Sequence, residues 1–277
     1  MSPLWRDEVR VVLSPDRVVL ARRKRGVRPQ VSAQVEVPCG QPAGAEPWRL
    51  PLVALTEVLQ EPQWRNANAV VILSSQFVRY VLVPWSDKLD SADEEIALAR
   101  HCFSRIHGEV AEQWTIRLSK ERAGASRVAS AVDSLLMSEL NTLFTASSLR
   151  LASIQPALMA AFNDSRRQMR GSSFWFVTAE SGKLCVALIS AGRWLVIRTR
   201  HTDGSWLAAL DTILSREERL ADAESIALTQ SGPIPVYLHG EGLADHALPE
   251  SQKWDWRLLS PESLTPCTPV ITAAEAS

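Results

Sequence analysis

The sequence predicts an α/β protein made of two similar halves. Each half opens with three short β-rich segments joined by turns, and a helix-forming segment and a further strand follow. Apolar segments bounded by Gly, Pro, Ser and Asp are typical of antiparallel meanders. The meanders cover residues 9–13, 18–21 and 31–37 in the first half and residues 174–177, 184–190 and 194–199 in the second. No sequence repeat of fixed period accompanies this duplication.

The composition is that of a globular chain with one large domain or two ordinary ones. Its 277 residues are 46% hydrophobic and 22% charged, unlike those of disordered chains. The formal net charge of -1 gives no electrostatic reason to expect a nucleic-acid partner. A basic cluster at residues 22–28 is interpreted as a solvated turn, with a phosphate or anionic-lipid contact as the alternative. We expect neither a signal peptide nor a membrane span, since no apolar run approaches roughly 20 residues.

The middle of the first half alternates strands and helices. A Pro- and Gly-rich loop at residues 38–47 leads to a helix predicted near residues 51–59. Two strands at residues 70–73 and 78–83, separated by a polar break, are expected to form a hairpin. Acidic residues then begin a helix at residues 90–107, and a strand follows at residues 114–118.

The later elements place a domain boundary near Arg170. A long helix is predicted over residues 128–144, a strand over 149–154 and a helix over 157–170, where Gly171 stops it. The second half adds a helix at 205–221 and strands at 235–239 and 254–259. We therefore expect a first lobe at residues 1–170, a second, smaller lobe at 171–262 and a flexible tail at 263–277.

Four segments together carry a resemblance to a known family. They are SSQFVRYVLVPW at residues 74–85, the acid-capped helix, WTIRL at residues 114–118, and VASAVDSLLMSELNTLFTASSLRLASIQPALMAAFN at residues 128–163. In this combination the chain resembles the actin-like pilus-assembly proteins of the PilM type and the cytoplasmic domain of the L component of type II secretion. The likeness in sequence covers the central third of the chain. The rest of the chain resembles the family only in the order of its predicted helices and strands.

The resemblance implies an actin-like ATPase fold with two ribonuclease H-like lobes and mixed sheets. It also implies a bacterial cytoplasmic scaffold, recruited to the inner membrane by a pilus or secretion assembly protein. Relatives hold a short segment of such a partner in a groove, which by position suggests Phe77, Val78, Tyr80 and Trp85 as the docking surface. The chain also contains ten tryptophans. If several of them lie together on the surface, they would mark a protein-binding site.

ATP use in this fold needs small residues at two hairpin turns, so that backbone amides can approach the phosphates, and an acid for magnesium. The first turn contains Ser14, Pro15 and Asp16, and no glycine occurs between Val9 and Ala21. Proline removes an amide donor at the point where one is needed. This turn is therefore degenerate, and we expect a pseudo-ATPase with no bound cofactor.

The second turn is closer to a phosphate loop. It contains Ser181 and Gly182, and Gly240 and Gly242 resemble the glycine turn that packs against adenosine in the relatives. These four residues are the candidates for a degenerate nucleotide site, although a short hairpin needs small residues in any case. ATP binding therefore remains an alternative.

Other chemistry lacks a matching pattern. The five histidines show neither metal-protease spacing nor a nucleophile elbow, and the four scattered cysteines lack zinc spacing and fit reduced thiols. We expect no catalytic residue and no metal. The predicted function is a non-catalytic scaffold that binds a segment of an inner-membrane partner as an added strand or an inserted helix. An active ATPase of the same superfamily and an unrelated adaptor that forms homo-oligomers are the alternatives.

Overall fold

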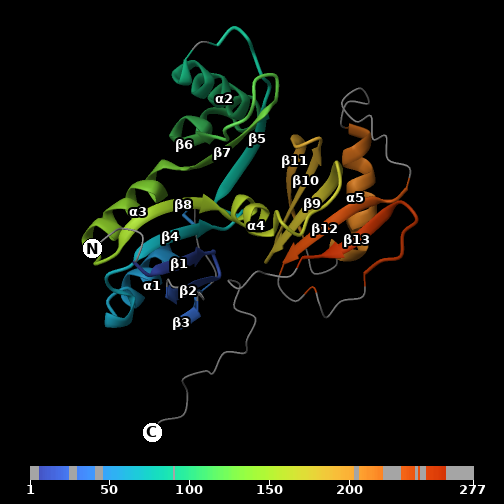
Figure 1. Ribbon diagram of the computed structural model, residues 1–277. Helices are drawn as coiled ribbons and strands as arrows, with labels where there is room; N and C mark the ends of the chain where they lie inside the picture. The colour runs from blue at the N-terminus through green and yellow to red at the C-terminus, as the bar shows by residue number, and fades with distance from the viewer. Residues whose placement is uncertain are drawn as a thin grey trace. The chain divides into compact units, whose positions relative to one another are not determined.

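The computed structural model describes residues 6–24, 30–40, 46–89, 91–202, 206–220, 232–240, 243 and 248–259 (Figure 1). Spatial contacts group them into two compact units. The first contains the described parts of Met1–Ile72 and Asn141–Gln155, and the second contains those of Leu73–Leu140 and Pro156–Ser260. The expected lobe boundary near Arg170 stays a prediction, because these units follow contacts in space and each is built from separate stretches of chain.

The first unit is organised around a five-stranded sheet of order β3-β2-β1-β4-β8. Its expected meander is confirmed, since β2 pairs antiparallel with both β1 and β3. Val9, Val11 and Leu13 alternate toward the core of this unit and are fully buried. The strands are β1 (Glu8–Leu13), β2 (Arg17–Lys24), β3 (Gln30–Pro38), β4 (Asn68–Leu73) and β8 (Arg150–Pro156).

Two helical segments pack in this unit, and the side chain of Arg22 links β2 to one of them. Helix α1 (Arg49–Val58) buries Leu52 and Leu55, and the short helix η2 (Pro62–Trp64) buries Trp64 completely. Arg22 pairs with Asp7 at 2.8 Å and donates hydrogen bonds to the backbone carbonyls of Gln63 in η2 and of Arg65 just after it. Arg22 therefore has a structural role, which corrects the expectation of a solvated turn for this residue alone; residues 25–28 lie outside the described chain.

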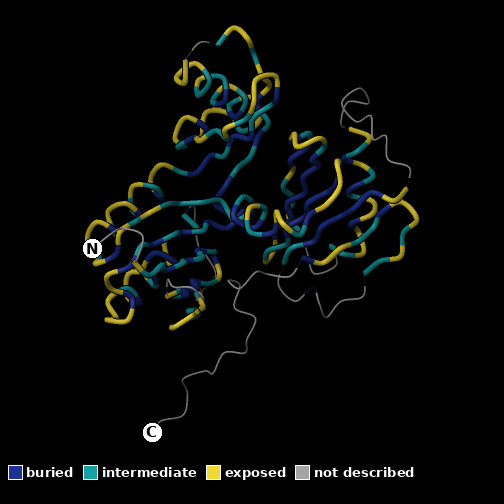
Figure 2. Tube along the Cα trace, viewed as in Figure 1, coloured by how far each residue is buried: buried dark blue, intermediate teal, exposed yellow. Residues whose placement is uncertain are grey.

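The second unit contains a mixed five-stranded sheet of order β11-β10-β9-β12-β13. The expected second meander is confirmed, because β10 pairs antiparallel with β9 and β11, whereas β12 runs parallel to β9 and β13. Figure 2 shows its central strands buried along most of their length. The strands are β9 (Ser173–Glu180), β10 (Lys183–Ser190), β11 (Arg193–His201), β12 (Ile234–Gly240) and β13 (Trp254–Leu258).

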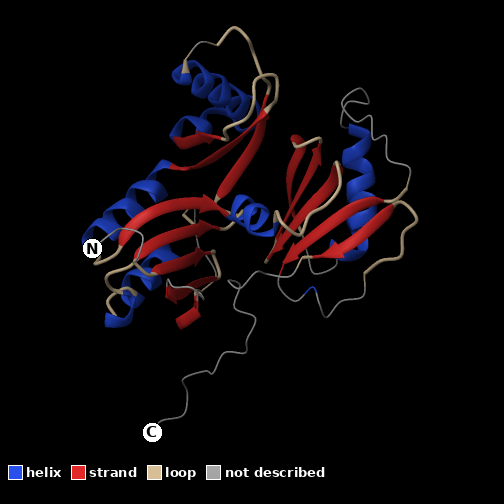
Figure 3. Ribbon diagram, viewed as in Figure 1, coloured by secondary structure: helices blue, strands red, loops and turns tan. Residues whose placement is uncertain are grey.

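Different elements cover the two faces of this sheet (Figure 3). Helix α5 (Trp206–Leu220) contributes Leu210 and Leu214 to an apolar cluster with Trp175 and alternate residues of β9, β10 and β12. Helix α4 (Ala157–Ser165) contributes Leu158 to the cluster on the opposite face. The sheet is thus buried on both sides, as continuous apolar strands indicate.

A three-stranded sheet of order β5-β7-β6 lies in the same unit. One of its faces packs on helix α2 (Ala92–His107), with Phe103 among the buried residues. Tyr80, Leu82 and Val128 on the other face join the cluster that contains Leu158. The strands are β5 (Val78–Val83), β6 (Trp114–Leu118) and β7 (Arg127–Asp133), and the short helix η3 (Gly108–Gln113) precedes β6. This sheet is therefore a layer between α2 and the larger sheet.

Two expectations about this region are wrong. Strands β4 and β5 form no hairpin, because each pairs within a different sheet. The segment expected to be one helix over residues 128–144 is strand β7 followed by helix α3 (Ser134–Ala146). β7 is the middle strand and is covered on both faces, so its apolar residues are nearly continuous and match helical spacing by chance.

The predicted acidic start of α2 is confirmed, and the structure shows that it contains a capping box. The Ser91 hydroxyl accepts from the Glu94 amide at 3.2 Å, and the Glu94 carboxylate accepts from the Ser91 amide at 3.1 Å. These contacts satisfy two amide donors at the helix entrance that would otherwise have no partner. The acids therefore have a structural role here.

Glu217 on α5 offers a test of the packing in the second unit. Its carboxylate is 2% exposed and contacts the guanidinium groups of Arg198 and Arg200 on β11. Glu217→Gln removes the charge that both arginines share, so we expect the free energy of unfolding to fall by about 2 kcal/mol in urea titrations. The matched change Glu218→Gln breaks a pair with the half-exposed Lys253 and should cost less than about 1 kcal/mol. Equal losses for the two variants would contradict this account.

Candidate functional site

The turn between β9 and β10 forms the centre of the candidate site. Strand register pairs Glu180 with Lys183, so Ser181 and Gly182 form a two-residue connection. Gly182 has φ +69°, a backbone conformation that side-chain-bearing residues rarely adopt. The turn geometry alone therefore explains this glycine, as the sequence analysis allowed.

Gly240 lies beside the same turn. It stands opposite Ala179 in the parallel pairing of β12 with β9. A Cβ atom at Gly240 would lie 3.0 Å from the Ala179 carbonyl oxygen and 3.2 Å from a methyl carbon of Leu243, closer than ordinary packing allows. The structure thus brings Ser181, Gly182 and Gly240 to one end of the sheet, while Gly242 lies outside the described residues.

The loop between β4 and β5 closes over this turn. The Ser74 hydroxyl donates a hydrogen bond to the Glu180 carboxylate, and the Ser75 amide donates to both carboxylate oxygens at 3.1 Å. The Gln76 side-chain amide donates to the Ser181 carbonyl at 2.7 Å. We call this set of contacts the Glu180 clasp. Sequence reasoning identified residues 74–76 only as a polar break, because their partner is about a hundred positions away.

A polar group of side chains lies around the clasp. Lys183 is only 6% exposed, and the hydroxyls of Ser75, Thr178 and Tyr80 are buried. The Ser75 hydroxyl interacts with Tyr80 and Cys185, and the Thr178 hydroxyl interacts with Cys185. Burial raises the pKa of the Cys185 thiol to about 12, and burial likewise raises the pKa of Tyr80 well above its usual value. Both groups are therefore neutral near pH 7.

The first turn, between β1 and β2, belongs to the other unit. Within it the Ser14 amide donates to the Arg17 carbonyl at 3.0 Å, and Pro15 is buried. The Ser14 amide is thus already hydrogen-bonded within the turn, and Pro15 has no amide hydrogen to donate. The expectation that this turn is unsuited to phosphate binding stays a prediction.

The residues of the expected docking surface have different environments. Phe77 and Val78 are 6% and 0% exposed, and Tyr80 packs against the core of the second unit. Trp85, just after β5, is 45% exposed. The structure therefore differs from a continuous four-residue surface, because β5 is covered on both faces, and Trp85 alone of the four is available as an anchor for a partner.

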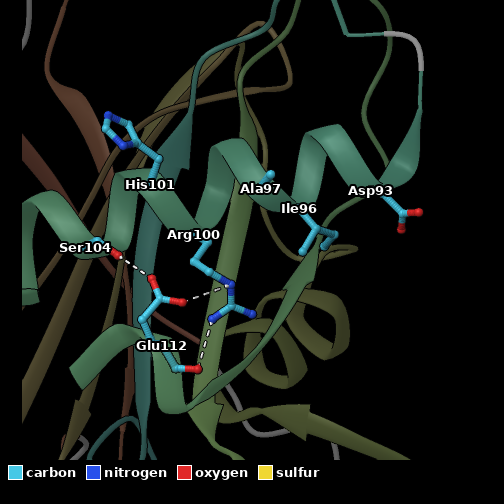
Figure 4. A pocket seen from close by; sticks show the side chains of 7 residues that line it. All are labelled: Asp93, Ile96, Ala97, Arg100, His101, Ser104 and Glu112. Carbon is cyan, nitrogen blue, oxygen red and sulfur yellow. Dashed lines mark hydrogen bonds and ion pairs between the residues drawn. The ribbon is translucent and has the colours of Figure 1, made fainter. Parts of the chain in front are cut away.

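A separate open pocket of about 460 Å³ lies along α2 and η3 (Figure 4). Arg100 in this pocket donates hydrogen bonds to the backbone carbonyls of Ala111 and Glu112. These bonds link η3 to helix α2. The lining residues are Asp93, Ile96, Ala97, Arg100, His101, Ser104 and Glu112. The described part of the chain contains no group of three or more potential metal-binding side chains, in this pocket or elsewhere.

Comparison with known proteins gives structural matches only. No known sequence family matches the chain. No curated protein matches it either. A chain of the PilM–PilN type IV pilus biogenesis complex has a TM-score of 0.61 at 14% identity, over 92% of this chain and 88% of the other. A Bacteroides thetaiotaomicron protein of unknown function with an actin-like ATPase fold has a TM-score of 0.58 at 10% identity, over 87% and 86%.

This chain has an actin-like fold. A third match is the cytoplasmic domain of EpsL, an inner-membrane component of the type II secretion system of Vibrio cholerae, with a TM-score of 0.53 at 15% identity over 92% and 90% of the two chains. The expected α/β class, with the actin-like ATPase fold and mixed sheets, is confirmed. Identities this low establish the fold, and the function needs a separate argument.

The Glu180 clasp can be tested by removing its acceptor. Glu180→Ala leaves the buried Ser74 hydroxyl and Ser75 amide without their partner, so we expect the free energy of unfolding to fall by about 2 kcal/mol in urea titrations. Glu109→Ala is the control, because Glu109 is exposed and should change stability by less than about 0.5 kcal/mol. A Glu180→Ala variant as stable as the parent would contradict the clasp.

Proposed function

We propose that this protein is a non-catalytic actin-like scaffold that binds a segment of an inner-membrane partner during type IV pilus or type II secretion assembly. Two of the structural matches, the PilM–PilN complex and the EpsL cytoplasmic domain, come from such machines and share nearly the whole fold. The proposal includes a cytoplasmic location in a bacterium and recruitment to the inner membrane by the partner. An adaptor of unrelated function, including one that forms homo-oligomers, is the competing assignment.

No helix among the described residues has the length and apolar character needed to span a membrane.

The Glu180 clasp is the observation that supports a non-catalytic assignment. A phosphate at the second turn would need hydrogen-bond donors, and the nearby Ser74 hydroxyl and Ser75 amide already bind a carboxylate. That carboxylate also carries the same sign of charge as a phosphate and would repel it. Pro15 weakens the first turn independently. Both turns on which ATP binding in this fold depends are therefore poorly suited to a triphosphate.

Calorimetry with magnesium and ATP tests the non-catalytic assignment. We expect no binding tighter than millimolar and no release of phosphate above a buffer control, because the clasp and Pro15 withhold amide donors from the phosphates. Micromolar binding with steady hydrolysis would overturn this assignment and favour an active ATPase of the same superfamily.

Trp85 is our choice for the partner anchor, because a half-exposed indole offers a large apolar area and one hydrogen-bond donor. We expect Trp85→Ala to weaken binding at least about tenfold, a loss typical of an interface hot spot. The ligands would be cytoplasmic segments of the inner-membrane pilus and secretion proteins of the source genome, measured by fluorescence anisotropy.

Leu220→Ala is the matched control, because Leu220 is 64% exposed and lies at the end of α5. It should leave the affinity unchanged. If none of the segments binds the parent protein, while the protein associates with itself or with soluble proteins, the unrelated adaptor becomes the better assignment. Equal affinities of the Trp85→Ala variant and the parent would remove Trp85 from the interface.

A further inference from the structure

Strand β3 lies at the edge of the first sheet, and one of its sides is open. Its one neighbour among the described strands is β2. The Cys39 amide donates to the Asp16 carbonyl at 2.6 Å, which fixes the alternation of hydrogen bonds between these two strands. Counted back from Cys39, residues 33, 35 and 37 point their backbone groups toward β2. The amides and carbonyls of Gln34 and Glu36 therefore point away from the sheet.

The sequence of β3 lacks the features that protect a free edge. Exposed edge strands usually carry lysines, prolines or several charges, which discourage pairing with another chain. A shift in register beside Ser32 ends the regular part of β3 on one side, and Pro38 ends it on the other. Between them, the sequence AQVEV contains one charged residue, Glu36. By contrast, the edge strand β11 of the other five-stranded sheet carries three arginines, at positions 193, 198 and 200.

One face of this stretch is apolar and only partly covered. Strand register places Val35 beside Leu20 and Val37 beside Val18, and these two β2 residues are fully buried. Ala33 continues the same face, because side chains two positions apart point to the same side of a sheet. Helix α1 packs on β2, whereas the three β3 side chains are only partly buried. A strand added beside β3 would remove more of this apolar surface from water.

The stretch is complementary to itself in one antiparallel register. Outward-pointing residues can exchange backbone hydrogen bonds, so Gln34 can pair with Glu36 of a second copy, and symmetry repeats the pair. Val35 then faces its own copy on the two-fold axis. The Gln34 side-chain amide faces the Glu36 carboxylate, which also pairs with Arg17 of its own chain at 3.1 Å. This register sets no like charges opposite each other, whereas pairing Glu36 with itself would oppose two carboxylates.

We propose that two copies of this chain associate through β3, in an antiparallel pairing centred on Val35 that joins their sheets. The pairing occupies the free edge of both copies at once, so it closes at a dimer. One short strand from each copy forms a small interface, and small interfaces give weak association, in the micromolar range.

This interface is separate from the proposed partner anchor. Strand β3 belongs to the first unit, whereas Trp85 belongs to the second. A dimer is compatible with a scaffold that also binds a membrane protein. Dimer formation and partner binding can therefore fail independently in their separate tests.

Sedimentation velocity of the full chain at increasing concentration tests the dimer. We expect the parent to change from monomer to dimer across the micromolar range. Gln34→Pro removes an amide that faces away from β2, so the monomer keeps its ladder and the dimer should weaken at least about tenfold. Gln34→Ala is the matched control, because it keeps the amide and should remain within about threefold of the parent. A monomeric parent, or equal association of the two variants, would overturn the proposal.

Cysteine cross-linking tests the register and does not require the proline variant to fold. Val35→Cys sets two thiols opposite each other at a non-hydrogen-bonded position, where Cα atoms lie about 4.5 Å apart and a disulfide can form. We expect oxidation to give a covalent dimer in excess of the parent treated in the same way, which accounts for the native cysteines. Gln34→Cys should cross-link far less, because its two copies are displaced along the strands. Stronger cross-linking of Gln34→Cys would contradict the register.

A strand from another protein is the competing occupant of this edge. If the parent stays monomeric and Gln34→Pro instead weakens binding of a pilus or secretion segment, β3 receives a strand of that partner. That result would replace the second copy as the occupant and would leave the scaffold assignment intact.

Discussion

Burial of both faces of the three-stranded sheet determines how the candidate site is built. Strands β5 and β7 place Tyr80, Leu82 and Val128 against the core of the larger sheet, while their other face packs on α2. Because β5 is fixed in this layer, the loop that enters it must pass beside the β9–β10 turn. Apolar packing therefore positions the polar residues of the Glu180 clasp, and the clasp adds specificity to an arrangement that the core has already established.

The two sides of the β9–β10 hairpin carry side chains of opposite charge. Toward the loop, the Glu180 carboxylate uses the donors that an anionic ligand would need. On the inner side, burial and the positive charge of Arg79 both lower the pKa of Lys183. One hairpin thus presents a hydrogen-bonded carboxylate toward the loop and a largely buried lysine on its inner side. The side chains at this hairpin, and not the fold, determine the chemistry that is available there.

Much of the fold could be predicted from local patterns. Both meanders, the acidic start of α2 and the turn at Gly182 depend on neighbours in sequence, and the structure contains all of them. The hairpin expected from β4 and β5 and the helix expected over β7 were wrong, because sheet assignment and two-sided burial depend on partners far along the chain. The candidate site divides in the same way. Ser181, Gly182 and Gly240 have local signals, whereas Ser74, Ser75 and Gln76 acquire their roles only through packing across the unit.

The path of the chain has a consequence for how this protein can be divided. The backbone passes from the first unit to the second after Ile72, returns after Leu140 and leaves again after Gln155. No single cut releases either unit intact, since each is assembled from separated stretches. A fragment that ended in the middle of the chain would lack β9 to β13, on which the three-stranded sheet packs. Either half of the chain therefore leaves apolar surface of one sheet without the partner on which it packs.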